Sequence, residues 1–175
     1  MLYPKLLMGE RPYFLKISKM HGFQEHRHSE IEINNCLKGH YDIIIGKNLY
    51  KVNEGEFVFI SSMTPHEIPV SPNSECQNLT MEIGPMLLSG YFEALSGIAP
   101  ENPVFNFKGI PSLNDLVEET AFLYQNPQDF SELMIRGNIG NQFIRRIRSF
   151  ASRLCRRQNL LLSIQKYYLC YSWCI

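Results

Sequence analysis

The first half of the chain consists of short segments in which apolar and polar residues alternate. Ile31, Ile33 and Leu37 alternate with polar neighbours, a period of two that is typical of β-strands. Further strand-like segments follow at residues 41–45, 49–52, 56–61, 66–70 and 76–83, with turn residues between them. Many short antiparallel strands at close spacing predict a small barrel or sandwich.

After Pro85 the pattern changes from a period of two to helical spacing. Residues 112–115 resemble a capping box, which precedes apolar residues on one helix face: Leu116, Val117, Ala121 and Tyr124. A second helix is predicted over residues 130–157, with a single apolar stripe: Ile139, Phe143, Ile147, Phe150 and Leu154. The predicted fold class is therefore mainly β with C-terminal α, a barrel followed by an antiparallel helix pair.

The apolar stripe of the second helix needs a partner surface. Five such side chains left in water would forfeit roughly 1.5–3 kcal/mol each. The preceding helix brings an apolar face of its own, and a two-fold related copy would cover both faces. The stripe therefore predicts a homodimer through the C-terminal helices. The alternative is a monomer whose helix pair folds back on the barrel.

Composition fits a single globular domain, with 45% hydrophobic and 19% charged residues in a chain of 175. No stretch has the length of a signal peptide or a membrane span, so we expect a cytoplasmic protein without a membrane partner. Five cysteines without a CxxC pair indicate reduced thiols. Residues 1–134 carry a net charge of −8 and residues 135–175 a net +8. This asymmetry indicates either a solvated basic helix face or contact with a polyanion.

Histidine and glutamate gather in the stretch HRHSEIEINNCLKG, residues 26–39. His26 and His28 share a face if they lie on one strand, Glu32 keeps the same parity, and His66 comes from another strand. Three imidazoles and one carboxylate suit a divalent transition ion such as Zn, Ni, Mn or Fe. The alternative is a ligand pocket without metal, lined by the same four residues together with Glu30 and Asn34.

These residues also match a known signature. The pattern HxHx3Ex6G, filled by His26, His28, Glu32 and Gly39, resembles the first signature of the cupin superfamily. The second signature is met in part, from Gly55 to His66, but residues 61–63 read Ser-Ser-Met where cupins usually have Pro-x-Gly. Val70 stands where an asparagine is usual. Over residues 22–83 the resemblance implies a jelly-roll barrel, also called a double-stranded β-helix.

The context of this barrel resembles the N-terminal sensor domain of AraC-type transcriptional regulators. We expect an N-terminal arm at residues 1–20, a cupin barrel at 21–110 and a helix pair at 111–157. The resemblance implies a non-enzymatic domain whose barrel binds a small effector and whose helices dimerise. A sugar, a polyol or a small carboxylate is compatible with a pocket lined by His, Glu and Asn.

In such regulators, DNA is bound by a separate helix-turn-helix part. Residues 155–175 have no helix-turn-helix character, and residues 158–175 fit no predicted element. Three interpretations stay open: a truncated gene product, a cloned sensor domain, and a frame-disrupted regulator. The alternative function is a stand-alone metal-dependent cupin enzyme, an isomerase or dioxygenase. The complete set of three histidines and one glutamate supports that alternative, and the arginine-rich helix counts against it.

Overall fold

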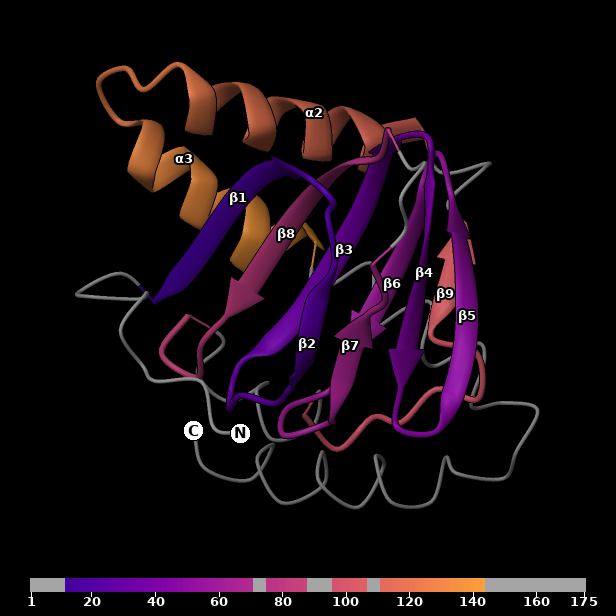
Figure 1. The fold of residues 1–175 in the computed structure, drawn as a ribbon. Coiled ribbons are helices and arrows are strands. Elements are labelled where there is room, and N and C mark those ends of the chain that lie inside the picture. The colour runs from indigo at the N-terminus through magenta and orange to yellow at the C-terminus, as the bar shows by residue number, and fades with distance from the viewer. Residues whose placement is uncertain (1–11, 71–74, 88–95, 107–110, 144–175) are drawn as a thin grey trace, which may run out of the picture.

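The computed structural model describes residues 12–70, 75–87, 96–106 and 111–143, without the side chains of 111–114 and 141–143 (Figure 1). One sheet has the strand order β1-β8-β3-β6-β9 and the other the order β2-β7-β4-β5, and all pairings are antiparallel. The strands are β1 (Tyr13–Lys19), β2 (Phe23–His26), β3 (Ile31–Lys38), β4 (His40–Ile45), β5 (Asn48–Asn53), β6 (Glu56–Ile60), β7 (His66–Ile68), β8 (Gln77–Ile83) and β9 (Val104–Asn106). The predicted fold class, a mainly β cupin-like barrel followed by helices, is confirmed.

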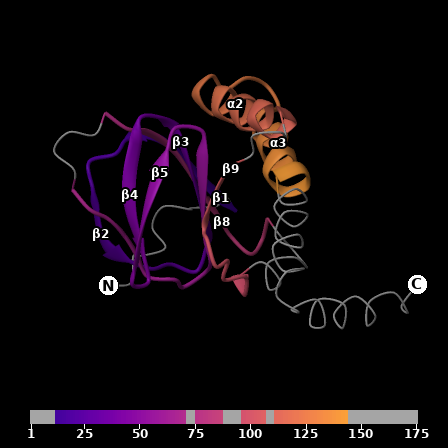
Figure 2. The ribbon, with the colours of Figure 1, turned by 90° about the vertical axis from the view of Figure 1, so that its right-hand side faces the viewer.

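Helices cover the outer face of the five-stranded sheet. They are α2 (Pro111–Gln125), α3 (Ser131–Gly137) and a π-helix, η2 (Asn138–Phe143). Figure 2 shows α2 and α3 on one side of the barrel, next to the sheet that contains β1 and β8. The core between them combines alternate strand residues, such as Ile33 and Leu79, with helix residues such as Leu116. Among the described residues, no helix is long and apolar enough to cross a membrane.

A second, smaller core fills the space between the two sheets. Tyr41, Ile43 and Val52 of one sheet pack there against residues of the other, including Val58 and Ile60. Cys36 and Cys76 also belong to it, as free thiols whose sulfur atoms lie 3.7 Å apart. The structure thus shows reduced cysteines at these two positions. On β3, Glu32 and Asn34 share the parity of Cys36 and therefore face the same interior.

The glycine of the first signature has a specific structural role. Gly39 has φ +79°, in the left-handed region, and it follows β3 directly. A Cβ atom at this position would lie 2.7 Å from the carbonyl oxygen of Glu75, which is too close for any side chain. Gly39 therefore lets the chain turn from β3 into β4 against the segment that leads into β8.

The structure differs from the sequence prediction at three places. Residues 13–19, predicted as part of an arm, form β1 and pair with β8 along seven residues. Residues 104–106 form β9, a short strand that pairs with β6. The predicted second α-helix changes to π-helix at Asn138, between Gly137 and Gly140, where two glycines leave the helix weakly determined.

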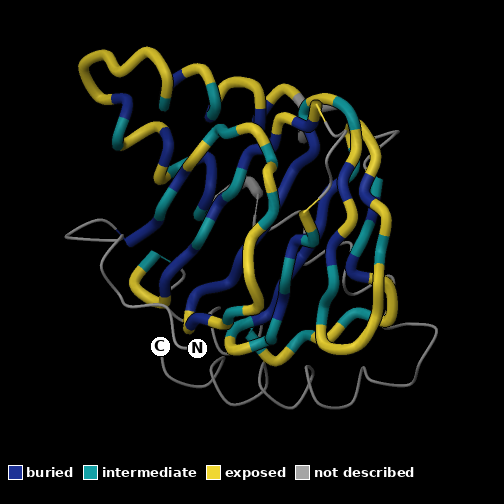
Figure 3. The backbone as a smooth tube through the Cα atoms, in the orientation of Figure 1, coloured by how far each residue is buried: buried dark blue, intermediate teal, exposed yellow. Residues whose placement is uncertain are grey.

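The apolar stripe falls only partly within the described residues. Ile139 is 1% exposed and belongs to the core between sheet and helices. The side chains of the other four stripe residues, and residues 144–175 as a whole, lie outside the described part of the chain. Figure 3 shows exposed residues along the outer side of α2 and α3. The large exposed apolar residues here are Phe122 on α2, Leu133 and Met134 on α3, and Phe130 directly before α3, and none of them belongs to the predicted stripe.

Candidate functional site

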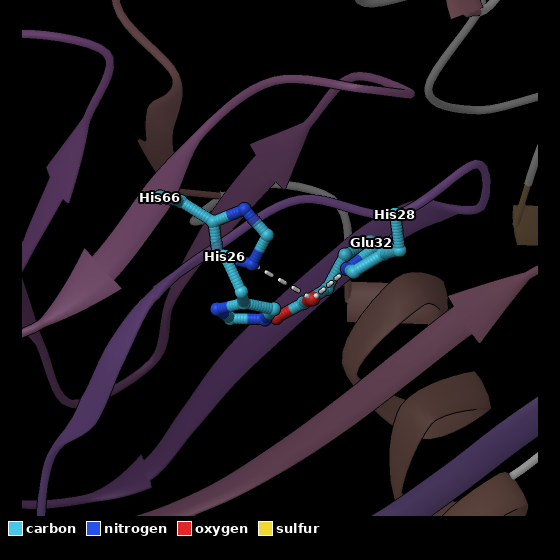
Figure 4. Close-up of side chains that lie close together, drawn as sticks. All are labelled: His26, His28, Glu32 and His66. Atoms are coloured by element: carbon cyan, nitrogen blue, oxygen red, sulfur yellow. Dashed lines mark hydrogen bonds and ion pairs between the residues drawn. The ribbon is translucent and has the colours of Figure 1, made fainter. Parts of the chain in front are cut away.

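Four of the predicted site residues converge between the sheets. His26 ends β2 and lies directly opposite His66, the first residue of β7. His28 lies in the segment that follows β2, and Glu32 lies on β3. One potential ligand atom of each residue lies within 4.8 Å of those of the other three. Figure 4 shows the four side chains pointing toward one another. The four side chains thus lie close together, as their spacing in the sequence predicted.

Glu32 is at the centre of this cluster and is 5% exposed. Its Oε2 atom accepts a hydrogen bond from His28 Nε2 at 2.8 Å and lies 3.2 Å from His66 Nε2. Its Oε1 atom accepts a hydrogen bond from Asn34 Nδ2 at 2.6 Å. The ring centroids of His28 and His66 are 5.2 Å apart, and those of His26 and His66 are 4.1 Å apart. The carboxylate therefore touches two of the three imidazoles directly.

Backbone carbonyls determine which nitrogen of two rings carries a proton. His26 Nδ1 lies 3.0 Å from the carbonyl oxygen of Gln24, and His66 Nδ1 lies 3.0 Å from that of Thr64. A carbonyl only accepts, so Nδ1 donates in both rings. A neutral His66 ring then turns the lone pair of Nε2 toward the carboxylate of Glu32. That nitrogen has no hydrogen-bond partner although it is buried.

Burial and charge act in opposite directions on these groups. Burial alone would raise the pKa of Glu32, but the hydrogen bond from His28 and the proximity of both imidazoles outweigh it and hold that pKa well below its usual value. Burial would lower the pKa of His28, and the hydrogen bond and charge of Glu32 more than offset this, so the pKa is raised. Burial, followed by the charge of His66, lowers the pKa of His26. Without a metal, Glu32 and His28 therefore form a carboxylate–imidazolium pair.

The cluster fits a divalent transition ion. Zn²⁺ binds imidazole nitrogen and carboxylate oxygen at about 2.0–2.2 Å, so a compact set of such donors can share one ion. Metal-binding histidines commonly donate their other ring N–H to a carbonyl, as His26 and His66 do here. The unpartnered Nε2 of His66 beside the carboxylate of Glu32 is the arrangement that a cation would stabilise. The residues that would hold it are His26, His28, Glu32 and His66.

Glu30 and Asn34, the other predicted pocket residues, have different surroundings. Glu30 is 9% exposed, and its Oε2 atom lies 3.7 Å from His28 Nδ1, beyond hydrogen-bond distance. Asn34 is fully buried and bonds Glu32 on one side and Asn78 and Thr80 on the other. Its amide is thus used by protein groups, and it supports Glu32.

Sequence reasoning missed three polar residues of the same interior, Asn78, Thr80 and Glu82. In β8 they alternate with Leu79, Met81 and Ile83, so the period of two could have indicated them. The register places Thr80 opposite Asn34 and Glu82 opposite Glu32. Burial, and then the charge of Glu32, raises the pKa of Glu82 to about 7.

A cavity of about 230 Å³ adjoins the cluster. It is lined by Glu25, His26, Arg27 and Pro65. His26 belongs to both the cavity wall and the His/Glu cluster, so a molecule in the cavity would meet the cluster through this ring. Neither His28 nor Glu32 is among the residues that line this cavity.

A known protein family matches most of this chain. The family described as AraC-like ligand binding domain matches residues 12–150. The chain belongs to this family. The AraC-like domain acts as a sensor in AraC-type regulators, and a ligand-binding domain of this kind implies a small-molecule effector.

Solved structures with the same fold include a transcriptional activator. The AraC-like transcriptional activator CuxR is similar with a TM-score of 0.54 and 13% identity, over 73% of this chain and 50% of that one. SPY1581 from Streptococcus pyogenes, a protein of unknown function, has a TM-score of 0.39 and 19% identity, over 43% and 68%. A cupin-2 domain protein from Shewanella frigidimarina has a TM-score of 0.37 and 20% identity, over 41% and 71%. This AraC-like domain spans half the length of CuxR, and no curated protein matches it.

Proposed function

We propose that this chain is the effector-sensing and dimerisation part of an AraC-type transcriptional regulator rather than an enzyme. The observation that carries the proposal is the buried His/Glu cluster beside a cavity, in a domain of the AraC-like ligand-binding family. DNA binding would come from a helix-turn-helix part elsewhere in the regulator. A protein that acts on DNA in this way works in the cytoplasm.

The polar interior supports a small hydroxylated effector. Thr80 and Glu82 are half-buried, face the interior and lie beside the cluster. Hydroxyl and carboxyl groups of this kind hydrogen-bond the hydroxyl groups of a sugar or a polyol. Lys16, exposed and opposite Thr80 on β1, would pair with a small carboxylate instead. A small carboxylate would thus need Lys16, whereas a sugar or a polyol would not.

A divalent ion at the His/Glu cluster is part of this proposal. His26, His28, Glu32 and His66 would hold it, and Zn, Ni, Mn and Fe all accept such donors. A bound ion supplies Lewis acidity and a further coordination position for an oxygen of the effector. Without an ion, the same side chains would hydrogen-bond the effector directly.

Dimerisation through the helix pair is supported by apolar side chains on its outer side. Phe122 is 56% exposed, Leu133 67% and Met134 44%. These residues lie on α2 and α3, away from the sheet that the helices cover. A two-fold related copy would cover them. The proposed dimer surface therefore differs from the stripe predicted from the sequence, of which Ile139 is buried in the core.

A thermal-shift screen with and without chelator tests the sensing role. A ligand that binds only the folded chain raises its melting temperature, by an amount set by ligand concentration and affinity. We expect stabilisation by at least one sugar, polyol or small carboxylate, and loss of that stabilisation in Glu32→Gln. A screen of all three classes without any shift would contradict the proposal.

A metal-dependent cupin enzyme is the second candidate, because three histidines and one glutamate can form a reactive metal centre. The two functions differ in turnover. A sensor loaded with Fe²⁺ or Mn²⁺ leaves sugar isomers and dissolved oxygen unchanged, whereas an isomerase or dioxygenase converts one of them. Product formation that disappears in His66→Ala would favour the enzyme.

A further inference from the structure

A buried hydrogen-bond network runs from Glu32 away from the histidines. Asn34 Nδ2 donates to Glu32 Oε1 at 2.6 Å. Asn34 Oδ1 accepts two hydrogen bonds, from Asn78 Nδ2 and from Thr80 Oγ1, both at 2.8 Å. Asn78 Nδ2 also donates to Thr80 Oγ1 at 3.1 Å. We call these three residues, Asn34, Asn78 and Thr80, the amide network.

The sheet itself sets the spacing of this network. Glu32 and Asn34 are two apart on β3 and therefore face the same side. Thr80 lies directly opposite Asn34, and Asn78 lies two residues away on β8, opposite Cys36, so it faces the same side as Thr80. Asn34 and Asn78 are both 0% exposed, so no water competes for their amide groups. The two asparagines of the amide network are thus held by the backbone and closed to solvent.

Donor and acceptor roles leave one orientation for each amide. An ionised carboxylate only accepts, so Asn34 turns its Nδ2 group toward Glu32. The Oδ1 atom of Asn34 then needs donors on its other side, and Asn78 and Thr80 supply them. A reversed amide at either asparagine would bring two acceptors together at Glu32 Oε1 or at Asn34 Oδ1. The charge of Glu32 therefore sets the orientation of both amides, and the amide network in turn holds the Glu32 carboxylate in place.

The orientation of Asn78 has a cost that supports this assignment. Its Oδ1 atom is buried and has no hydrogen-bond partner. A buried unpaired acceptor is unfavourable, and an apolar side chain at this position would avoid it. Asn78 keeps its Nδ2 group toward Asn34 and Thr80 even though its carbonyl oxygen is left alone. The role of Asn78 is thus to donate these two hydrogen bonds.

We infer that the amide network is a positioning device that holds Glu32 Oε1, so that Oε2 alone is presented to the histidines and to a divalent ion. The inference rests on the proposed metal site. Neither Asn78 nor Thr80 is among the candidate ligands, so both act through Asn34 and Glu32. Partners that orient a metal-binding carboxylate typically change metal affinity by about 10–100-fold when they are substituted.

Zn²⁺ titration calorimetry of folded variants tests this inference. Asn78→Asp keeps the shape of the side chain but replaces the donor by an acceptor. We expect it to weaken Zn²⁺ binding by about 10–100-fold. Thr80→Val removes only one of the two donors to Asn34 Oδ1, and it should lose less affinity than Asn78→Asp. If Asn78→Asp does not fold, Thr80→Val still gives a measurable loss.

Asn35→Asp is the matched control. Asn35 is adjacent in sequence and 5% exposed, but it lies on the opposite face of β3 and donates to the carbonyl oxygen of Glu56. It should bind Zn²⁺ as the wild type does. If the wild type binds Zn²⁺ and Asn78→Asp and Thr80→Val bind it equally well, the inference is overturned while the metal site stands. If the wild type binds no Zn²⁺, the proposed metal site and the inference both fail.

Discussion

The Nε2 atom of His66 lies 3.2 Å from Oε2 of Glu32, while Nδ1 of the same ring is bonded to the carbonyl oxygen of Thr64. In the neutral ring, two acceptors therefore face each other in a buried place. A proton or a metal cation between them removes this repulsion. The same Glu32 oxygen also accepts from His28 Nε2 at 2.8 Å. Protons and metal ions thus compete for one oxygen and its histidines.

The raised pKa of His28 makes the stability of the metal-free chain depend on pH. Burial lowers this pKa, and Glu32 raises it by more. A histidine with a raised folded-state pKa contributes stability that is complete below its unfolded pKa and is lost as pH rises through the folded pKa. We therefore expect the free energy of unfolding to fall as pH rises above about 6.5. His28→Gln should flatten this dependence in urea unfolding at several pH values. Equal slopes for the two proteins would contradict the pairing.

Glu82 should destabilise the chain when it is ionised. Burial, and then the charge of Glu32, raises its pKa to about 7. The unfolded chain loses this proton at lower pH than the folded chain, so stability falls as pH rises from the usual glutamate range to about 7. Glu82→Gln should raise the free energy of unfolding at pH 8. We expect a gain of only about 1–2 kcal/mol, because Glu82 is partly exposed and solvent screens its charge. Near pH 4 the same substitution should change the free energy of unfolding little. Glu118→Gln, an exposed carboxylate on α2, is the control and should change neither value.

Ile139 should contribute to folding rather than to assembly. It is 1% exposed in the core between the helices and the sheet. Ile139→Ala should lower the free energy of unfolding by about 2–5 kcal/mol, because it leaves a cavity in a packed core. Urea unfolding measures this loss. A loss of well under 1 kcal/mol would show that the side chain is not in the core.

Leu133 should contribute to assembly rather than to folding. It is 67% exposed on α3, close in sequence to the exposed Met134. If the helix pair forms the dimer surface, Leu133→Glu places a charge in an apolar contact and should yield monomers at micromolar concentration. Light scattering after size exclusion gives the mass. Leu49→Glu, at an exposed leucine on β5, is the control and should stay dimeric. A monomeric wild type would contradict the proposed dimer.

The sequence predicted the strands and the cluster because both depend on local rules. Alternation along residues 31–37 fixed which side chains of β3 face one way, and the spacing of His26, His28 and Glu32 brought them together. His66 was predicted to join them through the signature, and the structure places it opposite His26. Residues 13–19 were missed as a strand, because an edge strand with one partner shows a weaker pattern than a central one.

Contacts between strands explain what the sequence could not predict. Asn78 and Thr80 meet Asn34 only because β8 pairs with β3 in one particular register. A shift by one residue would turn both side chains to the opposite face. The packing of Ile139 is a similar case, since the apolar stripe is equally compatible with a sheet or with a second chain. Periodicity shows that a face is buried and does not identify what buries it.

Metal titration of the wild type beside Glu32→Gln tests the central claim most directly, namely that His26, His28, Glu32 and His66 form one site. The account predicts one Zn²⁺ ion per chain for the wild type. It predicts a loss of more than about 100-fold in affinity for Glu32→Gln, beyond the range expected for a supporting residue. Binding should also weaken as pH falls, because protons compete for His28. A wild-type chain that binds no ion, or one whose Zn²⁺ affinity survives Glu32→Gln, would contradict the account.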